Sequence, residues 1–394
     1  MGEGHQSSGI YIHVPFCEKL CPYCDFAVSI KVDIPHREYT DVVVEELERR
    51  ASEVEQHRIE TIYFGGGTPA LLRPDCLAEI REAIEVNFDV DDGAEVTLEA
   101  NPNQVTARHL EAWRELGIER LSIGCQSFQP RHLQALRRNH DGQMAKEAAI
   151  RALGTMERVS IDLMFAGPSQ PMEEWRADLQ VMQQLVEEHG LDHVSGYNLT
   201  IEPGTAFWIR RKRGTVVTPD HETAADMLDE LVEATADVGL RRYEVSNFSA
   251  PGAESRHNSS YWSGRPYLGV GVGAHSLAVD AGGAARRRKN PERYDAYIDA
   301  GAKPEEIEEL RPADHLAERL FTGARTRFGI DFDELATQFE PGVGRAHLED
   351  IRQVLDDLVE RDWMELDDDV YRPTNRGLNF SDSLAEWLFE AAMS

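Results

Sequence analysis

Short apolar runs alternate with amphipathic stretches along the first half of the chain. The first run, residues 9–14, is apolar and β-branched, as expected of a buried strand. Further predicted strands fall at residues 61–64, 95–100, 120–124, 159–165 and 193–199. Between them, apolar residues at helical spacing predict helices at residues 34–57, 77–88, 107–116, 130–138, 142–156 and 173–188. Six such units predict an α/β fold with a parallel sheet. Because a closed barrel needs eight units, we expect a partial (β/α)6 TIM-like barrel.

The pattern changes after residue 300, so we predict two domains, residues 1–300 and 301–394. An acidic linker at residues 303–312 is expected to open the second domain. Three helices, a tight β-ribbon at residues 364–372 and a last helix at residues 375–391 resemble a winged helix. Winged helices often bind DNA, but residues 305–394 hold 23 acidic and nine basic side chains, a net charge of −14. We therefore expect a mainly helical cap or protein-contact module.

The whole chain is acidic, with a net charge of −30 over 394 residues, and it contains 35 arginines but six lysines. Such a surface repels phosphates, which argues against a nucleic-acid partner. It also suggests a halophilic protein, since hydrated carboxylates keep a protein soluble in high salt. No run approaches 18 apolar residues, and residues 1–9 lack a signal-peptide core. We therefore expect a soluble, cytoplasmic protein.

Three of the five cysteines lie within eight residues. Cys17, Cys21 and Cys24 have the spacing C-x3-C-x2-C, on a loop after the first predicted strand. Structural zinc needs four closed ligands and usually two C-x2-C pairs, and no second pair exists here. Buried, apolar thiols are the other simple interpretation. A [4Fe-4S] cluster with one iron open to a non-protein ligand fits three thiolates best.

Polar and glycine residues follow the next strands at their carboxyl ends. Gly66, Gly67 and Thr68 follow the second strand, and glycine lets backbone approach a ligand closely. The later strand ends carry Glu99, Gln126 and Asp162. Each side chain alone has a simpler role, as a helix cap or an arginine partner. Together they occupy the edge where barrel ligands bind, so we expect one site there.

The cysteine spacing, with Tyr23 directly before the third cysteine, and the GGGTP sequence resemble the radical S-adenosylmethionine superfamily. The resemblance implies a [4Fe-4S] cluster whose open iron binds S-adenosylmethionine, and cleavage of this cofactor to a 5′-deoxyadenosyl radical. The motifs also match the oxygen-independent coproporphyrinogen oxidase family, in which Tyr11 and Arg138 correspond to ligand-site residues. The resemblance therefore implies that S-adenosylmethionine is bound by Tyr11, Tyr23, Gly66, Gly67, Thr68, Glu99, Gln126, Arg138 and Asp162.

Two branches of that family differ in features visible here. The oxidases carry a fourth cysteine, where this chain has Phe26, and an N-terminal extension, for which this chain leaves no room. The haem chaperones called HemW lack both and share the H-N-x-x-Y-W sequence that begins at His257. The resemblance therefore favours a protein that binds haem as cargo and delivers it to respiratory haem proteins, some associated with membranes. His257 is a candidate haem ligand, although the sequence is equally typical of a helix cap with core aromatics.

Several alternatives stay open. Oxidative decarboxylation of coproporphyrinogen is one, and another radical reaction on a small substrate is a second. Radical chemistry would require an electron donor such as ferredoxin or flavodoxin. Two basic runs, at residues 210–213 and 286–289, are either solvated loops or contacts for a carboxylate ligand such as a porphyrin.

Overall fold

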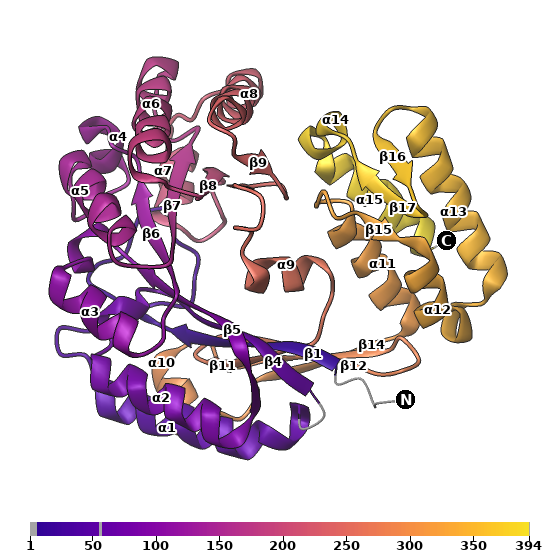
Figure 1. Ribbon diagram of the computed structural model, residues 1–394, viewed down its shortest axis with the longest axis horizontal. Coiled ribbons are helices and arrows are strands. Elements are labelled where there is room, and N and C mark those ends of the chain that lie inside the picture. Colours follow the sequence, from indigo (N-terminus) through magenta and orange to yellow (C-terminus); the bar gives the residue numbers. More distant parts are fainter. Residues whose placement is uncertain (1–5, 55–56, 394) are drawn as a thin grey trace.

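The computed structural model describes residues 6–54 and 57–393. Within them, one twelve-stranded sheet runs in the order β14-β13-β12-β11-β1-β4-β5-β6-β7-β8-β10-β9 and curves into an open barrel (Figure 1). Its central parallel strands are β1 (Gln6–Val14), β4 (His57–Gly66), β5 (Asp89–Ala100), β6 (Arg120–Gln126), β7 (Arg158–Phe165) and β8 (His193–Asn198). These are the six predicted strands, so the partial barrel is confirmed.

Helices cover the outer side of the parallel strands (Figure 1). Their amphipathic faces bury apolar residues against the sheet, and aspartates begin two of them: Asp141 accepts a hydrogen bond from the Met144 amide, and Asp220 from that of Thr223. The helices of this part of the chain are α1 (His36–Arg50), α2 (Pro74–Asn87), α3 (Ala107–Glu115), α4 (Pro130–Ala135), α5 (Gly142–Leu153), α6 (Met172–His189), α7 (Ala206–Lys212), α8 (His221–Asp237), α9 (Arg256–Trp262) and α10 (Tyr294–Asp299). Helix α9 is an exception to the outer arrangement, because it lies between β1, β4 and the C-terminal helix α11 (Pro312–Gly323) (Figure 1).

The helix predicted at residues 34–57 is too long. Helix α1 ends at Arg50 and a short 3-10 turn, η1 (Ala51–Val54), follows it. Residues 55–56 lie outside the described residues, and His57 already begins β4. Apolar spacing alone does not show where a helix gives way to a strand, because both elements bury apolar side chains here.

The sheet extends beyond the barrel at both edges. β8 pairs antiparallel with β10 (Asn247–Ser249), which pairs with β9 (Arg241–Arg242). At the other edge, β11 (Tyr267–Gly271) runs parallel to β1 and leads into the antiparallel strands β12 (His275–Val279), β13 (Ala285–Lys289) and β14 (Glu306–Leu310).

The pairing of strand β14 shows that two predictions are wrong: a linker at residues 303–312 and a solvated loop at residues 286–289. Residues 303–312 are not a simple linker, because β14 is hydrogen-bonded to β13. The basic run at residues 286–289 is not a solvated loop either. It forms β13, in which Arg286 lies 2.7 Å from Glu309 and Arg287 lies 2.8 Å from Glu308. The second domain therefore begins at about residue 311 rather than 301.

The C-terminal unit has its own hydrophobic core. Its elements are α11 (Pro312–Gly323), β15 (Ile330–Asp331), α12 (Phe332–Val343), α13 (Arg345–Glu360), β16 (Met364–Asp367), β17 (Val370–Pro373), α14 (Asn375–Asn379) and α15 (Ser381–Met393). The predicted ribbon is present as β16 and β17, and β15 adds a third strand that was not predicted. The last helix, predicted as one, is divided into α14 and α15.

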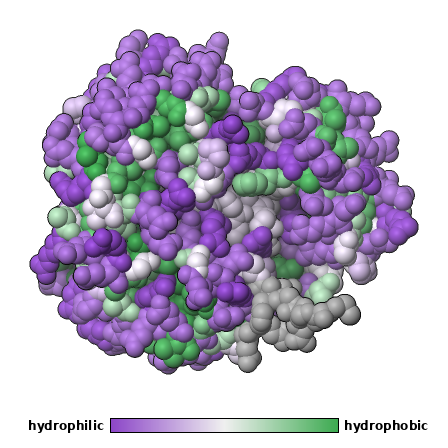
Figure 2. Space-filling model, in the orientation of Figure 1, coloured by the Kyte–Doolittle hydropathy of each residue, from purple (hydrophilic) through white to green (hydrophobic). Residues whose placement is uncertain are grey.

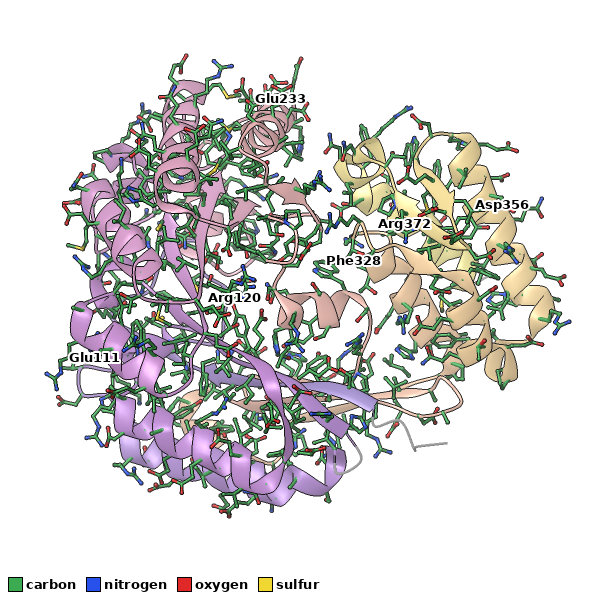
Figure 3. The ribbon with its side chains drawn as sticks, viewed as in Figure 1. Glu111, Arg120, Glu233, Phe328, Asp356 and Arg372 are labelled. Atoms are coloured by element: carbon green, nitrogen blue, oxygen red, sulfur yellow. The ribbon has the colours of Figure 1, made fainter. Side chains whose placement is uncertain are left out.

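The C-terminal unit faces the open side of the barrel (Figure 1). Helix α11 packs against α9 and β14. Phe328 extends toward the barrel domain, where its ring lies 6.4 Å from that of Tyr243 (Figure 3). Arg242 donates a 2.8 Å hydrogen bond to the Asn379 side chain. These contacts place the unit against both edges of the open sheet.

Hydrophilic residues cover most of the face in Figure 2. Acidic side chains on the outer helices, such as Glu111 and Glu233, are exposed and project away from the barrel (Figure 3). No helix within the described ranges is both long and apolar enough to span a bilayer.

Candidate functional site

A cavity of about 450 Å³ opens at the carboxyl ends of the parallel strands, and we call it the strand-end cavity. Its size is within the range of small-molecule sites, roughly 300–1,000 Å³. Eleven of the thirteen candidate site residues line it: Cys17, Cys21, Tyr23, Cys24, Gly66, Gly67, Thr68, Glu99, Gln126, Arg138 and Asp162. They come from six separate segments, which the parallel strand order brings to one edge.

The three thiols of the cysteine loop are partly exposed and reduced. The Cys17 sulfur lies 3.7 Å from the Thr68 hydroxyl, and the Cys21 sulfur accepts a 3.6 Å contact from Arg138. Burial raises the pKa of Cys17 to about 11, so cluster assembly there must displace a proton.

No group of three or more His, Cys, Asp or Glu side chains among the described residues is spaced to hold a single metal ion. In a [4Fe-4S] cluster each thiolate binds a different iron, so the three thiols of this loop need not converge on one metal ion. Arg138 adds a positive charge beside the thiols, and its Nε has no hydrogen-bond partner in the described chain. The donor set therefore fits a [4Fe-4S] cluster with three protein ligands.

The glycine loop after β4 passes very close to β1 and the cysteine loop. Gly66 has φ +109°, and a Cβ atom there would lie 2.7 Å from the His13 ring. A Cβ atom on Gly67 would lie 2.8 Å from the carbonyl group of Pro15. Only glycine fits these positions, so the backbone itself forms this wall of the cavity.

Glu99 is held at the end of β5 by two donors. The Tyr63 hydroxyl donates to one carboxylate oxygen at 2.7 Å, and the Gly66 amide donates to the other at 3.1 Å. Burial raises the pKa of Glu99 to about 7, with a further contribution from Asp162. Each oxygen keeps a free acceptor site, so the ionised carboxylate can accept hydrogen bonds from a pair of ligand hydroxyls.

Asp162 and Arg138 complete the polar lining. Burial raises the pKa of Asp162 to about 6, although the Ser122 hydroxyl donates to both of its oxygens at 3.1 and 3.2 Å. Arg138 donates to the Gly124 carbonyl at 2.9 Å and contacts Asn101, so its guanidinium is fixed in direction. The cavity therefore combines two acceptors with one fixed cation.

Tyr11 and His257 are the two candidates outside this cavity. Tyr11 lies in β1 with its hydroxyl 3.1 Å from His13. His257 is 1% exposed, and its ring nitrogens lie 2.8 Å from the Thr61 hydroxyl and 2.9 Å from the Tyr261 hydroxyl. Burial lowers the pKa of His257 to about 3, so the ring is neutral. Because both nitrogens are occupied and the ring is enclosed, the geometry gives His257 a structural role and offers haem iron no ligand there.

Three residues of the site were not among the candidates. Tyr63 positions Glu99 from the neighbouring strand, Asn101 bonds to Thr68 at 3.1 Å, and Tyr197 lines the cavity at the end of β8. Tyr197 lies near the end of a predicted strand, as the other site residues do, so the sequence pattern could have identified it. From the sequence, Tyr63 is expected to be a core aromatic residue, because the sequence does not show which strand lies beside Glu99.

A second cavity of about 530 Å³, the interdomain cavity, lies between the barrel domain and α11. Asp25, Phe26, Gly66 and Glu99 line both cavities. The Phe26 side chain is 64% exposed. Tyr11, absent from the strand-end cavity, lines this one. The two cavities are therefore neighbours that share one wall.

Comparisons with known proteins agree with this architecture. Residues 11–182 match the family model described as Radical SAM superfamily, and residues 310–380 match the HemN C-terminal domain. The structure of coproporphyrinogen III oxidase (HemN) from Escherichia coli has a TM-score of 0.79 with this chain, covering 98% of this chain and 90% of that one. At 20% identity, it shows the fold alone.

Curated relatives extend over nearly the whole chain. The heme chaperone HemW of Escherichia coli is 31% identical, covering 96% of this chain and 97% of its own length. The mouse mitochondrial radical S-adenosyl methionine domain-containing protein 1 is 34% identical, covering 96% and 86%. This chain therefore belongs to the radical S-adenosylmethionine superfamily, in the HemN-like family and close to the haem chaperones HemW.

Proposed function

We propose that this protein is a haem chaperone that binds haem and delivers it to respiratory haem proteins. The observation that carries the proposal is Phe26, an exposed phenylalanine where the oxidases have a fourth cysteine. It lies on the wall between the two cavities, so no extra thiol faces either of them. The whole-length similarity to proteins named heme chaperone HemW supports the same function.

The strand-end cavity is proposed to hold the cluster and S-adenosylmethionine. Cys17, Cys21 and Cys24 would hold the iron, and the backbone of Gly66 and Gly67 would approach the amino acid part of the cofactor. Glu99 would accept hydrogen bonds from the ribose hydroxyls. When bound, the pair supplies one-electron reductive cleavage, with ferredoxin or flavodoxin as the proposed electron donor. A cytoplasmic location is part of this proposal.

The test adds haem, and separately coproporphyrinogen, to anaerobically reconstituted protein. We expect a haem absorption band in the first case. In the second case, with an electron donor and S-adenosylmethionine present, we expect no protoporphyrinogen. Conversion of coproporphyrinogen would instead establish the oxidase reaction and show that the fourth cysteine is dispensable. Formation of 5′-deoxyadenosine is followed in both mixtures, because it reports whether radical chemistry is used.

The oxidase is the second candidate, and the shared fold with HemN favours it. Similarity of fold does not establish an activity, since one fold hosts many reactions. A different radical reaction on a small substrate remains a third candidate, which the deoxyadenosine measurement would detect.

A further inference from the structure

We propose that the interdomain cavity is the haem site, with His275 as the iron ligand and Arg319 as the partner of a haem carboxylate. The inference rests on the proposed chaperone function and names the site where the cargo binds. It replaces His257, whose ring nitrogens are both occupied.

The ring of His275 is free to bind a ligand. His275 begins β12 after a tight turn at Gly271 and Gly273, which have φ +95° and +67°. The residue is exposed, lines the interdomain cavity and makes no side-chain hydrogen bond within the described chain. A neutral imidazole with no hydrogen bond to its ring can offer a nitrogen lone pair to iron.

Arg319 is a partly buried cation without a carboxylate partner. In the C-terminal unit, which is strongly acidic, it makes no ion pair with any described residue. Its guanidinium makes one hydrogen bond to the described residues, a long one of 3.4 Å to the Gln338 side chain. The Arg319 side chain packs directly against Gly264. This glycine has φ +63°, and a Cβ atom there would lie 2.1 Å from the Arg319 Cδ. A carboxylate ligand would supply the missing partner.

Arg287, the other arginine that lines the cavity, is already paired. Glu318 lies 2.5 Å from Arg287, and Glu292 lies 2.6 Å from Lys289. Among the arginines of the lining, Arg319 is therefore the one without an ion pair to a described residue, whereas the acidic Asp25 and Glu99 lie on the wall shared with the strand-end cavity. On the same face of α11, His315 donates from Nδ1 to the Gly283 carbonyl at 2.9 Å, and its buried Nε2 has no partner among the described residues.

Aromatic side chains form much of the remaining wall. Tyr261 and Tyr267 meet edge to face, with ring centroids 4.6 Å apart, and Tyr11 and Leu277 also line the cavity. Flat aromatic surface, one free imidazole and one unpaired guanidinium are the groups that a planar, iron-containing dicarboxylate requires. Phe26 and Glu99 place this ligand directly beside the strand-end cavity.

The test titrates cluster-loaded, anaerobic protein with haem and, separately, with iron-free protoporphyrin, each recorded against the same protein without ligand. We expect His275→Ala to shift the haem Soret band and weaken haem binding by about tenfold, while protoporphyrin affinity is unchanged. Arg319→Gln should weaken both ligands by roughly tenfold to a hundredfold, and Arg319→Lys should recover part of this loss. His221→Ala and Arg345→Gln are matched surface controls and should bind as wild type.

Each contrary result identifies what failed. A wild-type Soret band in His275→Ala, or wild-type affinity in Arg319→Gln, overturns the inference and leaves haem binding at another site. Absence of haem binding by the wild-type protein overturns the chaperone proposal and this site with it. Far-UV circular dichroism confirms that each variant is folded.

Discussion

Replacement of Glu99 by glutamine should stabilise the protein at pH 8 while weakening its cofactor site. Burial raises the pKa of Glu99 from 4.5 to about 7, so this carboxylate makes the folded state less stable as pH rises through that interval. Each pKa unit corresponds to about 1.36 kcal/mol, giving roughly 3 kcal/mol at pH 8.

Glutamine removes this cost but also loses one acceptor. Its amide oxygen can accept from Tyr63, and its NH2 group then faces the Gly66 amide, a donor. The lost hydrogen bond costs about 1 kcal/mol, so the net gain at pH 8 is about 2 kcal/mol. At pH 5 the folded wild type carries a protonated Glu99, and the gain should largely disappear.

Binding of S-adenosylmethionine should change in the opposite direction. Loss of hydrogen bonds to a charged acceptor costs roughly 1.5–3 kcal/mol, or about tenfold to a hundredfold in affinity at pH 8. Wild-type affinity should also rise with pH through about 7, as Glu99 ionises. Anaerobic calorimetric titration measures binding, and thermal unfolding without ligand measures stability.

Glu111→Gln, on the exposed face of α3, is the matched control and should change neither quantity. A Glu99→Gln protein with wild-type affinity at pH 8 would remove Glu99 from the cofactor site. A variant less stable than wild type at pH 8 would refute the reasoning from burial.

Three further changes test other parts of the structure. Cys21→Ser should lose the bound iron and brown colour of the anaerobic protein, and an unchanged iron content would exclude this thiol as a ligand. Gly67→Ala should weaken S-adenosylmethionine binding about tenfold, because its Cβ would lie 2.8 Å from the backbone of Pro15; Gly154→Ala, whose nearest neighbour would be 3.7 Å away, should bind normally. His257→Ala should destabilise the fold by about 2–4 kcal/mol through loss of its two hydrogen bonds and stacked ring, yet leave the haem Soret band unchanged; an altered band would restore His257 as a ligand.

Much of the strand-end cavity could be predicted from the sequence. The local spacing of Cys17, Cys21 and Cys24 is enough to predict a [4Fe-4S] cluster, because these thiols are close together in the chain. Glu99 and Asp162 are distant in sequence, but both lie toward the carboxyl ends of parallel strands. Parallel order brings such ends to one edge, and strand identity alone therefore predicted that these residues meet.

The remaining features depend on contacts between distant segments. The basic run at residues 286–289 resembles a loop until the glutamates of β14 pair with it. His257 resembles a metal ligand until its enclosure by Thr61 and Tyr261 is seen.

His275 and Arg319 are 44 positions apart in different domains, and only the packing of α11 against the barrel places them around one cavity. The sequence by itself determined the cysteine loop and the strand-end positions, because short-range spacing and strand order specify them. Tertiary structure decided which polar groups are buried, paired or left free, because burial and pairing depend on the surfaces that close over each group.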